Sequence, residues 1–235
     1  MKAFFATALV AVVTVALANL TRRSDAPYGD KKGLAYSNGA LTSVLSTSGS
    51  TTWAYNWAST ADAPLFQQIP IPWVLGYNEP DMTNANGGCD ASPQAAYNAW
   101  GDDMFQFYDG GASLVCPAIT SDNQPAASWG TLGPHVVERF YQHQAPEWRG
   151  AVAVQMQCSG TTLVNSFFGT TMLIWVTEFS PMPTSDVQLM SNFLDVAIPW
   201  LDAQSYIDRY SPFMADYFVT NDALNVAGET FVHTS

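Results

Sequence analysis

The chain has 235 residues, of which 48% are hydrophobic and 12% charged, so it is expected to fold as one globular domain with a sizeable core. Its 20 acidic and 8 basic residues give a net charge of -12, which disfavours nucleic acid and other polyanionic partners. Aromatic residues make up 13% of the chain, including eight Trp. Such rings fill cores and also stack on flat apolar faces of neutral ligands.

The N-terminus has the layout of a secretory signal peptide. Lys2 precedes an apolar stretch over residues 3–18 that ends in small residues at Ala16 and Ala18. The stretch is shorter than the about 20 residues that span a membrane. We therefore expect a signal peptide at residues 1–18, a short segment at 19–31 and one domain at 32–235. The mature chain would be secreted to the extracellular space or cell wall, with no membrane contact.

Short β-rich segments alternate with helical segments along the domain. The expected strands are residues 33–36, 52–57, 74–77, 113–116, 151–155, 173–177 and 207–210, and the expected helices are residues 93–108, 135–143 and 186–201. This alternation predicts an α/β fold with a parallel sheet. Several strands end in polar or aromatic residues, which favours a (β/α)8 TIM-type barrel. No glycine-rich nucleotide loop supports a doubly wound sheet instead.

Two apolar strands, in residues 73–81 and 173–180, each deliver a glutamate at the carboxyl end, where barrels place their active sites. These glutamates are Glu79 and Glu178. Glycoside cleavage with retention requires two carboxyl groups about 5–5.5 Å apart, one as acid and one as nucleophile. A single glutamate at a strand end is usually a solvated surface group, but two in this arrangement favour a catalytic pair. The chemistry needs no cofactor.

Six segments carry a resemblance to a known family. In chain order they are residues 32–36, 53–57, 75–81, 114–118, 175–179 and 209–210. Together they resemble glycoside hydrolase family 128, whose members act on β-1,3-glucan. The resemblance implies Glu79 as acid/base and Glu178 as nucleophile, with β-glucan as partner. With the paired glutamates, the signal-like N-terminus and the many aromatic residues, we expect a secreted, monomeric, retaining endo-β-1,3-glucanase. The expected substrate-binding residues at the strand ends are Tyr36, Trp57, Tyr77, Asn78, Trp175 and Tyr210.

The sequence departs from the family pattern in three places. The interval from Trp57 to Leu75 is too short for a third strand and two crossover helices, because each parallel crossover takes a dozen or more residues. Residues 157–173 are also short for a crossover and are poor in helix formers. The barrel is therefore expected to be incomplete or compact around strand 3 and the strand 6 to 7 crossover. Residues 155–157, Gln-Met-Gln, replace a His, an aromatic residue and a Tyr of the family pattern.

These departures keep two other hypotheses open. One is a non-catalytic cell-wall glucan-binding protein that retains the cleft without turnover. The other is an incomplete gene product, whose broken barrel would expose apolar strand edges.

Other reactive residues give weaker signals. Cys89, Cys116 and Cys158 are odd in number, which predicts one disulfide and one buried thiol, and their spacing does not decide the pairing. His135 and Glu138 are three apart on an expected helix, but without a third ligand they predict a solvated face and no metal. A Gly-x-Ser-x-Gly motif is not found in the sequence, so a serine hydrolase is a poor alternative.

Overall fold

The computed structural model describes residues 10–14, 31–46, 51–58, 73–80, 82, 90–110, 113–119, 152–154 and 174–234. They contain an eight-stranded sheet in the order β2-β3-β1-β4-β5-β6-β7-β8. Its strands are β1 Val10–Thr14, β2 Gly33–Ala35, β3 Trp53–Tyr55, β4 Trp73–Tyr77, β5 Ser113–Ile119, β6 Val152–Val154, β7 Ile174–Val176 and β8 Ile207–Tyr210. The seven strands expected from the sequence are β2 to β8, each within a few residues of its predicted bounds.

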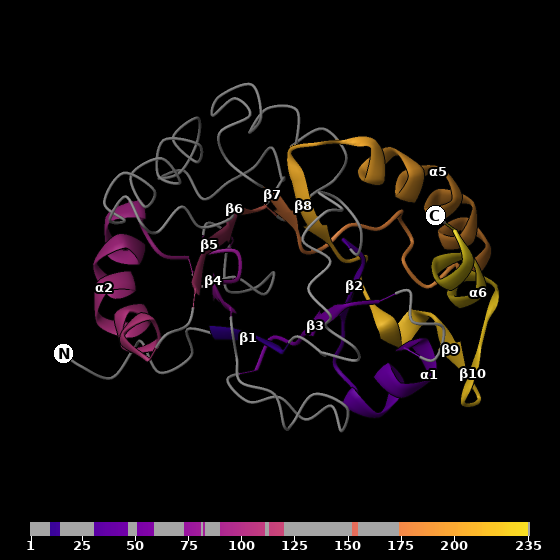
Figure 1. The fold of residues 1–235 in the computed structure, drawn as a ribbon, viewed down its shortest axis with the longest axis horizontal. Coiled ribbons are helices and arrows are strands. Elements are labelled where there is room, and N and C mark those ends of the chain that lie inside the picture. The colour runs from indigo at the N-terminus through magenta and orange to yellow at the C-terminus, as the bar shows by residue number, and fades with distance from the viewer. Residues whose placement is uncertain are drawn as a thin grey trace, which may run out of the picture.

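Helices lie outside the curved sheet (Figure 1). They are α1 Thr42–Ser46, α2 Pro93–Asp109, α5 Val187–Ala203 and α6 Val226–His233, with short 3-10 turns η1 Gly39–Leu41 and η5 Ala215–Tyr217 and a hairpin of β9 Val219–Thr220 and β10 Ala223–Leu224. The first turns of α5 and α6 are capped by Asp186 and Asn225, whose side chains accept backbone N–H groups. The expected helices 93–108 and 186–201 correspond to α2 and α5, whereas 135–143 lies outside the described residues.

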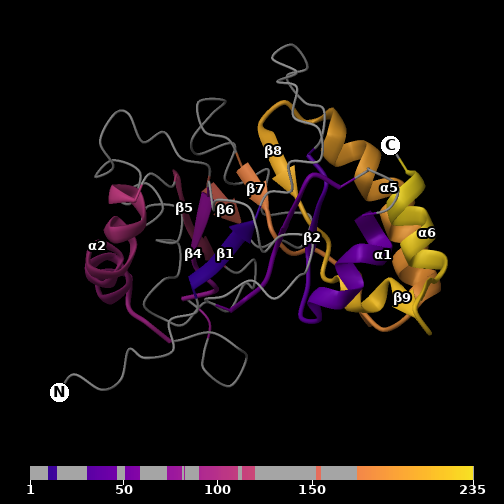
Figure 2. The same cartoon turned by 60° about the horizontal axis from the view of Figure 1, so that its bottom comes forward.

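The α/β class is confirmed, but the all-parallel barrel needs a correction at the third position of the sheet. The strand there is β1, which comes first in the chain and runs antiparallel to both neighbours, with Val13 opposite Tyr55 of β3 and Trp73 of β4. All other neighbouring pairs are parallel. The two edge strands of the sheet, β2 and β8, are joined by a bridge between Lys32 and Tyr210. Figure 1 shows β1 lying between β3 and β4, and Figure 2 shows β1 beside β4.

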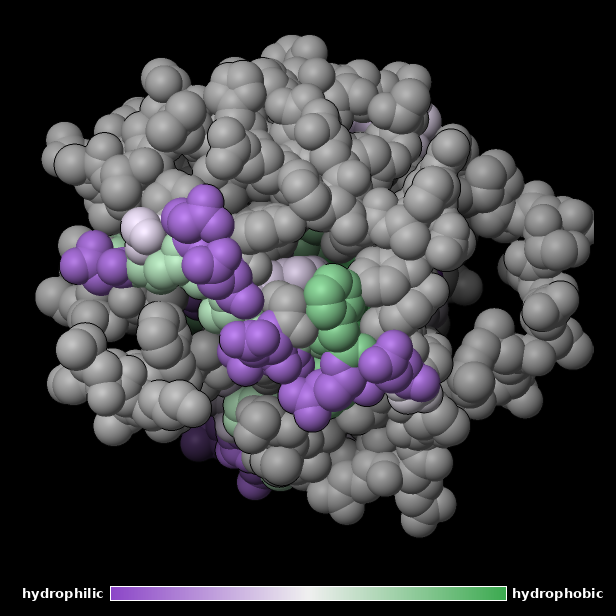
Figure 3. Space-filling view, turned by 90° about the vertical axis from the view of Figure 1, so that its left-hand side faces the viewer, coloured by the Kyte–Doolittle hydropathy of each residue, from purple (hydrophilic) through white to green (hydrophobic). Residues whose placement is uncertain are grey.

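Side chains of the sheet divide into two buried groups. The inner cluster consists of Ala35, Trp53, Tyr55, Leu75, Val115, Ala118 and Trp175. The outer cluster lies between the sheet and the helices and includes Leu34, Tyr36, Ala54, Val74, Tyr77, Ile207 and Tyr210 together with Leu194 and Ile198 of α5 and Trp100 and Met104 of α2. Alternation along each strand produces this division, because successive side chains point to opposite faces. The described outer face of α2 is mainly hydrophilic, with a small hydrophobic area (Figure 3).

Irregular pairing in β4, β5 and β8 interrupts this alternation. In β4, the four residues from Val74 to Tyr77 lie opposite the three residues from Val10 to Val12 of β1, so one extra residue is inserted. In β8, Ile207 pairs with Ile174 while Arg209 already pairs with Trp175. Such a bulge turns the following side chain to the other face. The bulge in β4 includes Gly76, where a Cβ would lie 2.8 Å from the backbone nitrogen of Pro117.

Two adjacent lysines connect the start of β2 to the ends of two helices. Lys31 Nζ donates to the carbonyls of Asp202 at 3.0 Å and Gln204 at 2.9 Å, at the C-terminal end of α5. Lys32 Nζ donates to the Phe231 carbonyl of α6 at 2.9 Å. These ammonium groups occupy the negative end of each helix dipole. Burial lowers the pKa of both lysines against the opposing charge of Asp202.

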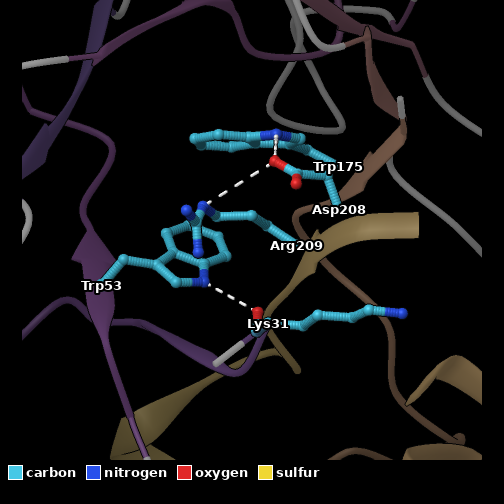
Figure 4. Close-up of polar contacts among 5 residues, drawn as sticks. All are labelled: Lys31, Trp53, Trp175, Asp208 and Arg209. Carbon is cyan, nitrogen blue, oxygen red and sulfur yellow. Dashed lines mark hydrogen bonds and ion pairs between the residues drawn. The ribbon is translucent and has the colours of Figure 1, made fainter. Parts of the chain in front are cut away.

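Polar contacts hold two side chains of the inner cluster, Trp53 and Trp175 (Figure 4). Trp53 Nε1 donates to the Lys31 carbonyl at 2.9 Å, and Trp175 Nε1 donates to Asp208 Oδ2 at 2.9 Å. The Arg209 guanidinium lies 5.6 Å from the centre of the Trp175 ring. These contacts fix both indoles inside the inner cluster.

Cys116 is buried, whereas Cys89 and Cys158 lie outside the described residues, so the predicted disulfide stays a prediction. Within the same residues, no helix is long and apolar enough to cross a membrane.

The pairing of β1 predicts that residues 1–18 contribute to stability. A chain starting at Asn19 lacks β1, so the facing edges of β3 and β4 lose their backbone partners, at about 1 kcal/mol for each hydrogen bond. We expect the truncated chain to unfold several kcal/mol more easily than the full chain in urea. Equal unfolding midpoints for the two chains would contradict a structural role for β1. Mass spectrometry of the protein purified from an expressing host would show whether residues 1–18 are retained.

Candidate active site at the ends of β4 and β7

Both predicted catalytic glutamates follow directly on sheet strands. Glu79 lies two residues after β4, where its N–H donates to the Ala118 carbonyl at 2.9 Å and Asn78 forms a bridge to Ala118 of β5. Its backbone has a φ of 41°, a left-handed conformation that is uncommon outside glycine. Strain of this kind clusters at functional sites, where the surrounding structure maintains it.

Glu178 lies two residues after β7 and is half-buried. Trp57 Nε1 donates to its Oε1 at 2.6 Å. A short N–H bond to a carboxylate oxygen stabilises the ionised form, which is the form that a nucleophile requires. Trp57 follows β3, so this bond joins strands that are not neighbours in the sheet.

Aromatic rings fix Trp57 on both sides. The Tyr55 ring meets it edge-on with centroids 5.5 Å apart, and the Phe213 ring does the same at 5.5 Å from beyond β8. Edge-to-face pairs at this distance are favourable. The indole N–H is therefore aimed at Glu178 by packing from two directions.

Tyr55 connects the two glutamates electrostatically. Its hydroxyl donates to the Thr177 carbonyl, next to Glu178. Complete burial raises the pKa of Tyr55 well above its usual value, and the charges of Glu178 and, more weakly, Glu79 raise this pKa further. The charges of both carboxylates therefore raise the pKa of the same hydroxyl.

Four of the predicted substrate-binding residues need a correction. Tyr36, Tyr77 and Tyr210 belong to the outer cluster, and each is less than 5% exposed. Tyr77 donates its hydroxyl to Asp103 of α2, and Tyr210 donates to Asp202 of α5, both at 2.9 Å. Trp175 is fully buried in the inner cluster. The bulges in β4 and β8 explain two of these placements, because they turn Tyr77 and Tyr210 toward the helices.

Two predicted residues stay at the strand ends. Trp57 and Asn78 are both partly exposed, beside Glu178 and Glu79 respectively. Tyr55 and Phe213, which pack against Trp57, were not predicted from the sequence. Period-two spacing contains the signal for Tyr55, because Trp53, Tyr55 and Trp57 share one face of an extended strand.

No three acidic, His or Cys side chains of the described residues are grouped to hold a metal ion. His135 and Glu138, which were expected on a solvated helix face without a metal, lie outside the described part of the chain. The same holds for residues 155–157, where the sequence departs from the family pattern.

Comparison with known proteins identifies the class. A sequence profile described as glycosyl hydrolase catalytic core matches residues 65–233, and the chain belongs to this family. Solved structures similar to it include several members of glycoside hydrolase family 128, so the resemblance predicted from the sequence is confirmed. The comparison with curated proteins gives no significant match.

Three of these structures show the range of activities. A subgroup III curdlan-specific exo-β-1,3-glucanase from Blastomyces gilchristii is 25% identical, with a TM-score of 0.63 over 88% of this chain and 100% of that one. A subgroup II endo-β-1,3-glucanase from Sorangium cellulosum is 18% identical, with a TM-score of 0.69 over 87% and 98%. A subgroup VII oligosaccharide-binding protein from Cryptococcus neoformans is 16% identical, with a TM-score of 0.64 over 88% and 94%.

The raised pKa of Tyr55 predicts how stability depends on alkaline pH. Above about pH 10 an exposed phenol in the unfolded chain loses its proton, whereas buried Tyr55 keeps it. The folded state then binds more protons, so the free energy of unfolding falls as pH rises, by up to about 1.4 kcal/mol per pH unit for this group. Urea unfolding between pH 10 and 11 should show a shallower decline for Tyr55→Phe than for the parent.

Tyr206→Phe is the control, because it removes a phenol from a partly exposed position. The lowered pKa of the lysines is common to all three proteins and cancels in the comparison. Identical slopes for the parent and Tyr55→Phe would contradict the prediction.

Proposed function

We propose that the chain is a retaining endo-β-1,3-glucanase that acts on cell-wall glucan. The observation that carries the proposal is the Trp57 indole bonded to Glu178 at 2.6 Å, beside a phenol on which both Glu178 and Glu79 act. Family membership supports glycosidase activity, and β-1,3-glucanases among the similar structures support this substrate. The signal-like N-terminus supports secretion, and we propose that the secreted protein acts as a monomer.

The proposed reaction has two steps. Glu178 attacks the anomeric carbon while Glu79 gives its proton to the leaving glycosidic oxygen, and a covalent glycosyl-enzyme forms. Glu79 then takes a proton from water, the water oxygen attacks the anomeric carbon, and the Glu178 carboxylate is released. The left-handed backbone at Glu79 and the indole bond at Glu178 give the two carboxyl groups different surroundings, as different roles require.

Single substitutions of the glutamates test the mechanism. Glu79→Gln and Glu178→Gln should each lower reducing-sugar release from a soluble β-1,3-glucan by about 10²–10⁴-fold, because each removes a group that reacts in the transition state. Glu229→Gln is the matched control, since Glu229 is exposed on α6 and pairs with His233 at 3.2 Å. Activity that survives either glutamate substitution would contradict the assignment, and NMR of the first-formed anomer tests retention.

A second candidate is a non-catalytic glucan-binding protein. It is favoured by similarity to an oligosaccharide-binding member of the family and by the altered residues 155–157. It predicts binding of a β-1,3-glucan oligosaccharide without release of reducing ends.

Trp57→Ala tests ligand contact under either function. Loss of a stacking indole should weaken oligosaccharide binding by about tenfold, as expected for about 1.4 kcal/mol. Trp200→Ala is the control, because Trp200 is 41% exposed on α5, which covers the outer face. Isothermal titration with a β-1,3-glucan oligosaccharide measures both. Equal weakening by the two substitutions would contradict a binding role for Trp57.

A further inference from the structure

Around the sheet, β3 and β7 are separated by β2 and β8. Two side chains from the β3 segment nevertheless reach the end of β7. The Tyr55 hydroxyl donates to the Thr177 carbonyl, and Trp57 Nε1 donates to Glu178 Oε1 at 2.6 Å. Tyr55 and Trp57 are two apart, so extended backbone directs both toward the interior. The contact therefore crosses the inner face and is independent of the strand ladder.

Backbone hydrogen bonds at the end of β7 show what Tyr55 contributes. The carbonyls of Val176 and Phe179 accept from the N–H groups of Ser211 and Phe213, at 2.8 and 3.0 Å, in the segment after β8. The carbonyl of Thr177, between them, accepts from the phenol of Tyr55. A buried carbonyl needs such a partner, and this one immediately precedes Glu178. β8 thus secures the end of β7 on one side, and Tyr55 secures it from the interior.

Tyr55 is itself rigidly held. It is 2% exposed, its ring stacks on Trp53 at 5.9 Å, and its carbonyl accepts from the Tyr36 N–H at 3.1 Å. Trp53 in turn donates to the Lys31 carbonyl. A side chain fixed at this many points can hold its acceptor in one position.

We propose that Tyr55 is a positioning residue of the active site, whose hydroxyl fixes the end of β7 and so aims the Glu178 carboxylate. This inference rests on the proposed glycosidase function. By fixing Thr177, the hydroxyl also keeps the Glu178 carboxylate in its hydrogen bond from the Trp57 indole, and this bond stabilises the ionised carboxylate. The ionisable groups that act on the hydroxyl are Glu178 from the end of β7 and Glu79 from the end of β4.

Tyr55→Phe tests the proposal and Tyr210→Phe is its matched control. Each removes one buried phenol hydroxyl that donates to one acceptor, but Tyr210 faces α5 on the outer side of the sheet. With a soluble β-1,3-glucan, Tyr55→Phe should lower kcat by about 10–100-fold with little change in KM, because a carboxylate displaced by a fraction of an ångström reacts poorly. Tyr210→Phe should leave both constants near those of the parent.

The pH profile separates positioning from a merely structural role. The acidic limb of kcat/KM reports ionisation of the nucleophile in the free enzyme, and it should move to higher pH in Tyr55→Phe. Replacement of Tyr55 by 3-fluorotyrosine keeps the hydroxyl and makes it a stronger donor, so the limb should move to lower pH. This second variant keeps the test valid if Tyr55→Phe does not fold. The proposal would be overturned if Tyr55→Phe left kcat and the acidic limb of kcat/KM unchanged, or if Tyr210→Phe changed them by the same amounts.

Carboxyl carbon NMR of ¹³C-glutamate-labelled protein distinguishes failure of this inference from failure of the proposed function. The Glu178 resonance, assigned by its loss in Glu178→Gln, should titrate at higher pH in Tyr55→Phe than in the parent. If the parent releases no sugar but the Glu178 resonance still titrates at higher pH in Tyr55→Phe, the glucanase function is refuted and the positioning contact is retained. If the parent is active and the Glu178 titration is the same in both proteins, the positioning role alone is refuted. If the parent is inactive and the titration is the same, both proposals are refuted.

Discussion

The place between β3 and β4 is the constraint on which the rest of the sheet depends. Backbone N–H and C=O groups of a buried strand need partners, and the chain between Trp57 and Leu75 is too short to supply a strand with its crossovers. β1 satisfies both edges by running antiparallel, which needs no crossover helix. With this place filled, the sheet is continuous from β2 to β8, and Lys32 and Tyr210 form a bridge between its two edge strands.

The candidate site depends on the same place in the sheet, because β3 pairs with β1 there. Tyr55 pairs with Val13 of β1 and Ala35 of β2, so its backbone is fixed on both sides. From this strand Tyr55 and Trp57 reach the end of β7 and hold Thr177 and Glu178. A glutamate at a strand end is thus given a defined position by residues far away in sequence, and a change at the third position of the sheet would be transmitted to it.

Much of this arrangement could be predicted from the sequence, and the failures have physical causes. Apolar runs and turn residues are local signals, so seven strands and two helices were found. Strand ends also predicted Glu178 and Trp57 at one edge, where a hydrogen bond joins them, because parallel strands carry their sites at one edge. Tyr77 and Tyr210 were misplaced because one extra residue in β4 or β8 reverses the side-chain direction, and only the pairing partner shows it. β1 was missed because its partners come from distant parts of the chain.

The same composition explains why residues 10–14 are predicted as a leader and found as a strand. Their sequence, Val-Ala-Val-Val-Thr, is apolar enough for a signal peptide and β-branched enough for a buried strand. The two roles exclude each other in one molecule, because a cleaved leader cannot pair with β3. A processed chain would keep Tyr55 and Trp57 but hold β3 through β2 alone, with an unpaired edge facing β4. The proposed secretion and the proposed activity would therefore be coupled: if export removed β1, turnover would depend on which segment then occupied the place between β3 and β4.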